Sequence, residues 1–179
     1  MGSSDLDDFD AFYRRTYASA YRTALGVTAS PELAEEVVQE AYCAAYRGRG
    51  GFRGDAPAEN WLQRIVVREA IDQCRRRRSR PTLVLDAEPE IEDREPAMAV
   101  SIDRLALLAA LSRLQARQRA AIVLRYFHDY PLRTVGEILG TSEGGATMLV
   151  QRALAHLRLE IAGETVGQTT SRRTEEAHE

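Results

Sequence analysis

The sequence predicts an all-α protein made of two small helical domains joined by an acidic, extended linker. Apolar residues recur at helical spacing over residues 5–80 and again over residues 101–162. The stretch 81–100 between them holds three of the six prolines, and its charged residues are six acids and one arginine. Within the second periodic stretch, two short helical patterns flank a turn with a glycine, which is typical of a helix-turn-helix. We therefore expect the C-terminal domain to be a helix-turn-helix.

Composition limits the class of protein. Hydrophobic residues make up 44% of the 179 residues, which is enough for packed cores. The sequence has no run near the ~18 apolar residues that a membrane span needs, and its acidic start is not a secretory signal. The two cysteines, Cys43 and Cys74, lie in helical patterns without metal-ligand spacing. We expect a cytoplasmic protein with reduced cysteines in the core, no metal and no cofactor.

Charge is segregated along the chain. All 24 basic residues are arginine, and the net charge is −3. Thirteen arginines and twelve acids precede residue 82, whereas six of the seven charged residues in the linker are acids. This separation favours two different kinds of partner surface, or one partner with two faces.

The first domain begins with two amphipathic helices. Residues 6–25 carry a broad apolar and aromatic stripe, which we interpret as core. Ser30 followed by Pro31 is a helix start, and the second helix should end at the glycine cluster 48–51.

A third helix, from Pro57 to about Arg78, combines an apolar stripe with arginines. Arg64, Arg68 and Arg75 share the face opposite the apolar stripe, with Asp72 spaced to pair with Arg68. Such a face suits a polyanion, although a solvated charged surface explains it equally well when taken alone. We expect Trp61 to belong to the core rather than to serve as a stacking platform.

Helical periodicity resumes at residue 101. A short helix from Pro131 to Leu139 should end at a turn containing Gly140, and Ser142 should cap the next helix, which runs to about Ile161. Residues 163–179 are polar, and we expect them to be disordered.

Taken in order, these segments resemble the extracytoplasmic-function (ECF) group of sigma-70 family RNA polymerase sigma factors over roughly residues 6–162. The match rests on four stretches in a fixed order: Ala34–Glu40 (AEEVVQE), Phe52–Asp55 (FRGD) with Trp61-Leu62, Asp72–Arg78, and Leu114–Arg119 (LQARQR) with Val123–Phe127 (VLRYF).

The resemblance implies a role for the first domain. Residues 5–80 correspond to sigma region 2, which binds core RNA polymerase and recognises and melts the promoter −10 element. The helix that docks on the basic coiled coil of the polymerase's largest subunit is matched by Glu35, Glu36, Gln39 and Glu40. The −10 contacts are matched by Arg53, Asp55, Asn60, Arg64, Arg68, Arg75 and Arg76. Arg68 stands where the family often has asparagine, so the preferred −10 bases stay open.

The resemblance also assigns the rest of the chain. Residues 81–100 correspond to the acidic linker that threads the polymerase channel, and residues 101–162 to the region 4 helix-turn-helix that reads the −35 element. The implied −35 contacts are Arg125, Ser142, Thr147, Met148, Gln151 and Arg152. Thr147, Met148 and Leu149 replace the basic and hydroxyl residues usual at the start of the recognition helix. Because neither Thr nor Met can replace arginine on guanine, we expect an unusual or weakly read −35 sequence.

The leading hypothesis is therefore an alternative sigma factor, which is not an enzyme and has no small-molecule substrate. Its expected partners are core RNA polymerase, promoter DNA and, as in many relatives, an anti-sigma factor. Two alternatives stay open: a polymerase-binding regulator or decoy with weakened promoter recognition, and a stand-alone helix-turn-helix regulator. No catalytic triad, phosphate loop or metal-ligand set can be assembled from the residues.

Overall fold

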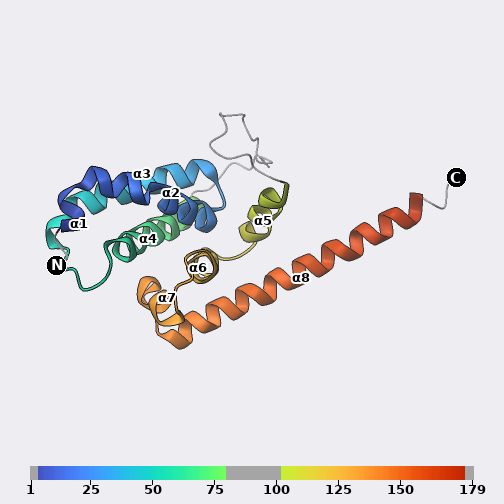
Figure 1. Cartoon of the computed structure of the whole chain (residues 1–179). Coiled ribbons are helices and arrows are strands. Elements are labelled where there is room, and N and C mark those ends of the chain that lie inside the picture. Colours follow the sequence, from blue (N-terminus) through green and yellow to red (C-terminus); the bar gives the residue numbers. More distant parts are fainter. Residues whose placement is uncertain (1–3, 80–101, 176–179) are drawn as a thin grey trace.

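The computed structural model describes residues 4–79 and 102–175, with side chains over 6–79 and 107–159, and its regular elements in these ranges are all helical. The first unit is a bundle in which α2, α3 and α4 pack on one another (Figure 1). Its elements are α1 (Ser4–Asp7), α2 (Phe9–Thr28), α3 (Pro31–Gly48), the 3₁₀ turn η1 (Arg49–Gly51) and α4 (Ala58–Ser79).

Local sequence signals set the starts of these helices. The Asp8 carboxylate accepts from the Ala11 N–H at 2.9 Å at the start of α2, and the Ser30 hydroxyl accepts from the Leu33 N–H at 3.4 Å at the start of α3. Pro31 occupies the first turn of α3, where its missing N–H removes no helical hydrogen bond. The predicted helix boundaries in this unit are thus confirmed to within a few residues.

The second unit is a set of shorter helices followed by one long helix. Its elements are α5 (Ile102–Ser112), α6 (Ala116–Ile122), the π-helical segment η2 (Val123–Phe127), α7 (Leu132–Leu139) and α8 (Glu143–Glu175). The helix-turn-helix is formed by α7 and α8. The acidic linker predicted at 81–100 lies outside the described residues.

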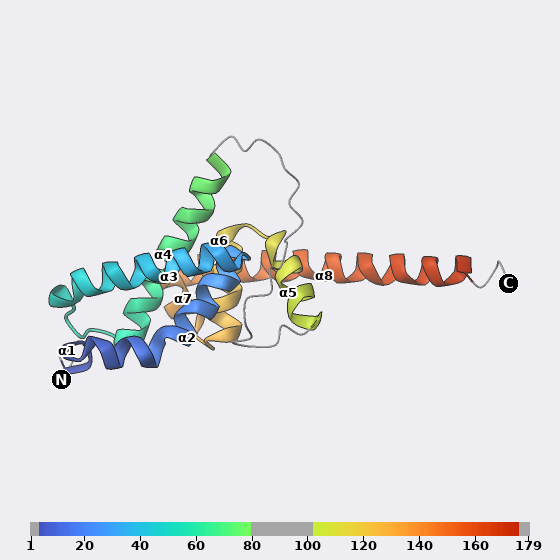
Figure 2. The ribbon, with the colours of Figure 1, turned by 90° about the horizontal axis from the view of Figure 1, so that it is seen from above.

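The long helix α8 corrects the prediction of a disordered tail from residue 163. Its backbone stays helical to Glu175 and projects well beyond the rest of the molecule (Figure 2). The stretch from Gly163 has no proline, and adding residues to an existing helix requires no new nucleation. Polar composition alone therefore did not end the helix.

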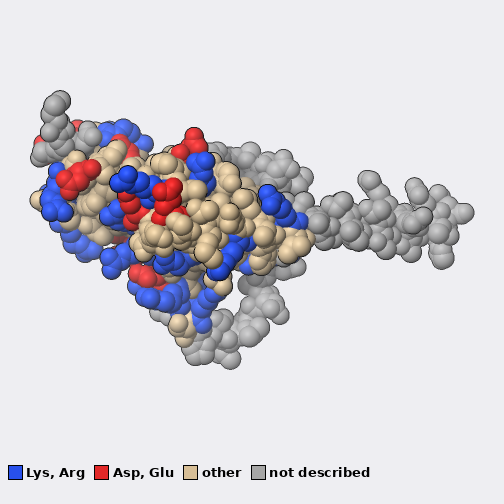
Figure 3. Space-filling model, turned by 90° about the horizontal axis from the view of Figure 1, so that it is seen from below, with Lys and Arg blue, Asp and Glu red and all other residues tan. Residues whose placement is uncertain are grey.

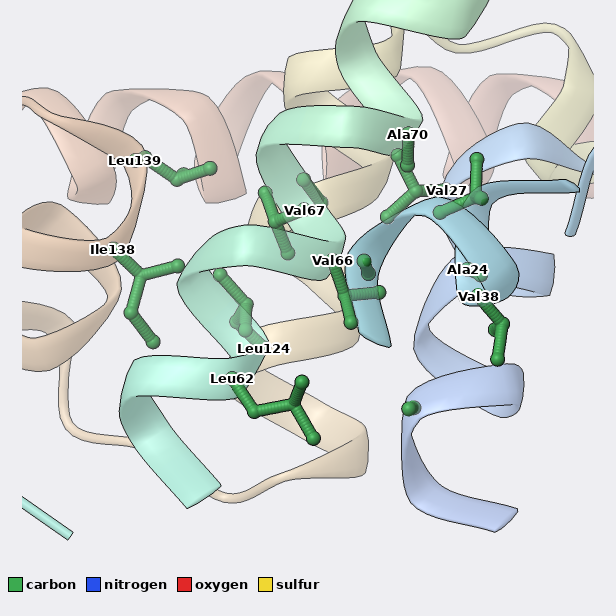
Figure 4. Packing of buried hydrophobic residues seen from close by; sticks show 14 of the residues in the cluster. Ala24, Val27, Val38, Leu62, Val66, Val67, Ala70, Leu124, Ile138 and Leu139 are labelled. Atoms are coloured by element: carbon green, nitrogen blue, oxygen red, sulfur yellow. The ribbon is translucent and has the colours of Figure 1, made fainter. Parts of the chain in front are cut away.

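The two units share one hydrophobic core. Helix α4 lies between α2 and α3 on one side and α6 and α7 on the other. Figure 4 shows Val66 and Ala70 of α4 toward Val27 of α2, while Val67 lies toward Ile138 and Leu139 of α7. Sequence patterns predicted two separate cores, because a buried stripe does not name the helix that covers it. They also placed both cysteines in the core, which is wrong for Cys43, since it lies on the exposed side of α3, while Cys74 is half-buried.

Gly26 lets the units approach closely. This residue lies in the last turns of α2 and is buried beneath η2. A Cβ atom added there would lie 2.6 Å from the Cγ2 atom of Val123, which is closer than packed atoms approach. Glycine is therefore required for this contact, although it is unfavourable inside a helix.

Arg119 of α6 joins the units through hydrogen bonds. Its side chain is 6% exposed, and it donates to the backbone carbonyls of Leu111, Ser112 and Leu114 at 3.5, 3.2 and 2.7 Å. It also donates to the carbonyl of Val27 in the first unit, and at 3.4 Å to the Sγ atom of Cys74. One guanidinium thus holds the end of α5 and the end of α2 together, using the fork of donors that only arginine has.

His128 closes the other side of the same contact. Its Nε2 atom lies 2.6 Å from the hydroxyl of Thr23 in α2, and its ring stacks on Tyr130. Arg22 of α2 lies over the neighbouring Phe127 ring, 5.7 Å from its centroid. Burial lowers the pKa of His128 from 6.5 to about 4, so the ring is neutral at pH 7.

We predict that Arg119→Leu lowers the free energy of unfolding by about 2–4 kcal/mol, because several buried carbonyls lose their donor. Denaturation with urea at pH 7.5 measures this change. Arg133→Leu is the control, since that side chain is exposed and makes a surface pair with Glu137. Equal loss in both variants would show that the Arg119 bonds contribute nothing specific.

We further predict that stability falls as the pH drops from about 6.5 toward 4. In that range the unfolded chain binds a proton at His128 that the folded chain does not, so the stabilisation is complete only above the unfolded pKa. Thermal melting between pH 5 and 7.5 should show a smaller pH dependence in His128→Gln, which still reaches Thr23. Parallel curves for the two proteins would exclude His128 as the titrating group.

Candidate nucleic-acid and polymerase interfaces

The four candidate polymerase-binding residues form one exposed face. Glu35, Glu36, Gln39 and Glu40 all lie on the outer side of α3, while Ala34, Val37, Val38 and Ala41 pack inward. The i, i+4 spacing of Glu35 and Gln39, and of Glu36 and Glu40, follows from the helix period. The structure thus presents three carboxylates together on the solvent-exposed side of α3.

Tyrosines border this acidic face. Tyr13 and Tyr17 of α2 are 39% and 38% exposed, with ring centroids 5.3 Å apart. Burial, Tyr13 and the negative charge of Glu35 together raise the pKa of Tyr17. The aromatic stripe predicted as core is therefore core on one side only, since Phe12 is fully buried whereas these two tyrosines reach the surface.

The arginine face of α4 is present and exposed. Arg64, Arg68, Arg75 and Arg76 are all solvent-accessible, and the end of α4 projects away from the bundle (Figure 2). Two of these arginines pair with carboxylates: Arg75 with Asp72 at 3.1 Å and Arg76 with Glu69 at 3.6 Å. The spacing had predicted that Asp72 pairs with Arg68; this prediction was wrong, because Asp72 pairs with Arg75 instead.

Acidic side chains interrupt the arginines elsewhere on the surface. Figure 3 shows arginine and acidic side chains side by side over much of this face rather than one unbroken basic area. Exposed pairs of this kind contribute little to stability, so their arginines can exchange a carboxylate for a phosphate at low cost. The surface suits a polyanion that approaches along α4.

The loop before α4 holds the remaining −10 candidates. Arg53 and Asp55 are exposed and pair at 3.4 Å, and Asn60 is half-buried in the first turn of α4. Trp61 is half-buried, with its ring 5.3 Å from that of Phe52, and it packs against the core. The interpretation of Trp61 as a packing residue agrees with this placement.

The helix-turn-helix has a tight turn. Gly140 ends α7 with a positive φ of 63°, and the Ser142 hydroxyl accepts from the Gly145 N–H at 3.1 Å at the start of α8. A Cβ atom on Gly136 would lie 2.9 Å from the carbonyl oxygen of Thr141, so α7 can approach the turn only with glycine there. The predicted glycine turn and serine cap are both confirmed.

The first turns of α8 carry an apolar and polar mixture. Met148 is 50% exposed, Gln151 and Arg152 are exposed, and Thr147 is half-buried with its hydroxyl bonded to the Glu143 carbonyl. Arg152 is the one cation among the −35 candidates of α8. The first turns of α8 therefore offer a methionine and one guanidinium, that of Arg152, where arginine-rich readers offer several donors.

Arg125 lies outside α8, the helix that carries most of the −35 candidates. It belongs to η2, where it donates to the Tyr130 carbonyl at 3.1 Å and pairs with Asp129 at 3.5 Å. These bonds hold the loop between η2 and α7. The side chain is 36% exposed, so it borders the surface while its guanidinium already has partners.

Some residues at the contact between the units were missed by sequence reasoning. Thr23 and Gly26 of α2 lie far along the chain from Arg119 and His128, and no local pattern links the two pairs. The one available signal was a glycine inside an otherwise good helical pattern, which often marks a close approach.

Family models match both halves of the chain. The sigma-70 region 2 model matches residues 12–80, and the sigma-70 region 4 model matches residues 104–157. In the part of the chain that the structure describes, no helix is long and apolar enough to cross a membrane, and no three metal-binding side chains gather in one place.

Curated and solved proteins give the same result. The ECF RNA polymerase sigma factor SigM of Mycobacterium tuberculosis is 35% identical over 87% of this chain and 78% of its own length. The RNA polymerase sigma-E factor of Streptomyces antibioticus is 27% identical over 90% and 88%. The sigma factor RpoE of Bartonella quintana, solved with the anti-sigma factor NepR, has a similar fold, with a TM-score of 0.71 at 23% identity over 87% of this chain and 97% of that one.

Proposed function

Since the chain belongs to the ECF sigma factors of the sigma-70 family, we propose that it binds core RNA polymerase and directs transcription initiation at a specific set of promoters. The observation that carries this proposal is the presence of both sigma regions on one chain, each with its candidate surface exposed. It acts by binding the polymerase and positioning it on promoter DNA, without catalysing a reaction itself, and it functions in the cytoplasm.

The acidic face of α3 is our proposed docking surface for the polymerase. Glu35, Glu36 and Glu40 point outward from a helix whose other side is locked in the bundle. A rigid array of carboxylates steers a basic partner and fixes its orientation. The partner of matching charge is the basic coiled coil of the largest polymerase subunit.

The loop at 52–57 and helix α4 are our proposed −10 surface. Opening a duplex requires that an unstacked base and a freed strand be held, at a cost of a few kcal/mol. The exposed Arg64 and Arg68 supply contacts to the strand, and Arg75 and Arg76 extend this line to the projecting end of α4. The exposed loop with Arg53 and Asp55 supplies polar groups for the base.

The start of α8 is our proposed −35 reader. Arg152 and Gln151 supply hydrogen bonds to the major groove, while Met148 supplies apolar contact to thymine methyl groups. Ser142 and Thr147 contribute hydroxyls near the same end of the helix. With Arg125 engaged by Tyr130 and Asp129, this reader should favour a thymine-rich −35 sequence.

An anti-sigma factor is a further proposed partner. Two solved proteins of similar fold were each captured with a partner: RpoE of Bartonella quintana with the anti-sigma factor NepR, and CnrH with the cytosolic domain of CnrY. The main alternative function is a polymerase-binding regulator with weakened promoter reading, which the sparse cations of α8 favour. A stand-alone helix-turn-helix regulator leaves the acidic face of α3 without a role.

Run-off transcription with purified core polymerase and upstream genomic DNA tests the proposal. Specific transcripts that require the added chain support a sigma factor. Tight binding to core without initiation would instead support the regulator. Tight binding to duplex DNA without core, at nanomolar concentration in physiological salt, would favour the stand-alone regulator.

We predict that Glu36→Arg with Glu40→Arg weakens binding to core polymerase at least tenfold, because like charges then face each other. Fluorescence anisotropy of the labelled chain titrated with core measures this. Glu137→Arg is the matched control, since Glu137 is exposed on α7 in the other unit. If the double variant binds as tightly as the control, the acidic face is not the docking surface.

We also predict that Arg75→Ala with Arg76→Ala makes promoter-complex formation less dependent on salt. Each lost phosphate contact reduces the slope of log K against log salt by about 0.7–0.9. Filter binding of the holoenzyme to promoter DNA at several salt concentrations gives this slope, with Arg14→Ala on α2 as the control. An unchanged slope removes both side chains from the path of the DNA.

A further inference from the structure

We propose that Ser79, the last residue of α4, is a phosphorylation site for an arginine-directed kinase, and that its phosphate withdraws the neighbouring arginines from promoter DNA. This inference rests on the proposed function, because it concerns the regulation of the −10 surface assigned to α4. Ser79 is the only serine, threonine or tyrosine of α4, and it directly follows the four consecutive arginines 75–78.

The arginines before Ser79 stand where an arginine-directed serine kinase reads its substrate. Acidic groups of such a kinase receive arginines two and three residues before the serine, so the charge pattern selects the hydroxyl that is modified. Arg77 and Arg76 occupy these two positions. No other serine or threonine among the 179 residues has arginine at both positions, so the pattern selects Ser79 alone.

The structure leaves the Ser79 hydroxyl accessible. The end of α4 projects away from the bundle (Figure 2), and residues 75–79 are all exposed. The hydroxyl donates to the Arg75 carbonyl of its own helix at 3.1 Å. Such a bond at the surface exchanges with water, and the last turn of a helix opens at little cost. A kinase can therefore take this segment into its active site without disturbing the core.

The modification transfers a phosphoryl group from a nucleoside triphosphate. The Ser79 Oγ atom forms a bond to the γ-phosphorus, the bond from that phosphorus to the bridging oxygen breaks, and a nucleoside diphosphate leaves. The hydroxyl proton passes to the catalytic base of the kinase. The product carries a charge of about −1.5 to −2 and three acceptor oxygens, where the unmodified chain has a neutral hydroxyl.

A phosphate on Ser79 lies next to two proposed DNA contacts. Residues three and four apart share one face of a helix, so Arg76 and Arg75 are the neighbours of Ser79 on α4. Both guanidiniums now pair with carboxylates at the surface, Arg75 with Asp72 and Arg76 with Glu69. A phosphate carries more charge than a carboxylate and accepts bidentate bonds from arginine. Because it belongs to the same chain, it also competes with DNA phosphates at a high effective concentration.

The helix dipole does not reverse this effect. An anion at the C-terminal end of a helix is unfavourable, so a phosphate that does not pair with the arginines loosens the last turn of α4. In that case the arginines lose their fixed positions, and the dianion repels the DNA backbone. Pairing occupies the arginines and loosening displaces them, so the −10 surface is weakened in both cases.

Ser112 is a matched control within the same chain. It is the last residue of α5, it is exposed, and its hydroxyl donates to the Ala109 carbonyl of its own helix at 2.7 Å. Alanines, Ala110 and Ala109, stand two and three residues before it. The two serines therefore share their exposure and their place at a helix end, and they differ in the arginines that precede them.

The first test treats the full chain with magnesium ATP and the catalytic subunit of cyclic-AMP-dependent protein kinase, an arginine-directed serine kinase. We expect one phosphate per chain, located at Ser79 by tandem mass spectrometry. Ser79→Ala should stay unmodified, and Ser112→Ala should be modified like the wild type. Absence of phosphate at Ser79, or equally fast modification of Ser112, would overturn the assignment of the site.

The second test compares the phosphorylated chain with the unmodified chain. Core polymerase should bind both within about twofold, since Glu35, Glu36 and Glu40 are exposed on a different helix, α3. The phosphorylated holoenzyme should bind promoter DNA at least tenfold more weakly. Its slope of log K against log salt should fall by about 0.7–0.9 for each of the two lost contacts. Treatment with a phosphatase should restore both values, and equal promoter affinity in the two forms would overturn the regulatory role.

A polyanion that is not a promoter separates this inference from the proposed function. The free phosphorylated chain should leave a heparin column at lower salt than the unmodified chain, whereas kinase-treated Ser79→Ala should not shift. If the unmodified chain binds neither core nor promoter while this shift occurs, the proposed function fails and the modification site stands. Identical elution of the two forms would show that the phosphate does not withdraw the arginines from a polyanion.

Discussion

The arrangement of the whole molecule depends on how the last turns of α2 receive the α6–η2 segment. Gly26 removes the side chain that would hold the helices apart, and Arg119 then reaches the Val27 carbonyl at the end of α2. Burying a guanidinium is costly unless its donors are satisfied, and here five acceptors surround it. The same side chain organises the end of α5, so the inner structure of the second unit and its position on the first are linked.

The candidate surfaces lie around this centre in a way that separates their roles. The acidic face of α3 is exposed to solvent, whereas α4 packs into the shared core with one side and presents arginines on the other. Helices α7 and α8 carry the helix-turn-helix on the opposite side of α4 from α3. A partner at α3 therefore meets a surface that the packing of the bundle has already formed.

Local structure and the family could be predicted from the sequence, whereas the contact between the units could not. Ser30, Gly140 and Ser142 contact groups only a few residues away, so their capping and turn roles can be predicted from the local sequence. Val67 and Ile138 are each predictable as buried, but helical period does not say that they meet. Asp72 pairs with Arg75 of its own helix, and Arg125 donates to the carbonyl of Tyr130 beyond its own helical segment. Helical spacing alone does not select between such partners. The polar composition after residue 163 suggested disorder, but α8 continues to Glu175. Extending a helix that has already formed needs no new nucleation.

The central claim is that the two units of the free chain form one body. A distance measurement on the free chain, by pulsed electron spin resonance between labels at Glu137→Cys on α7 and Asp10→Cys on α2 in a Cys43→Ser background, tests this most directly, since all three positions are exposed. The account predicts one narrow distance distribution for the free chain. A broad distribution in the free chain would contradict it.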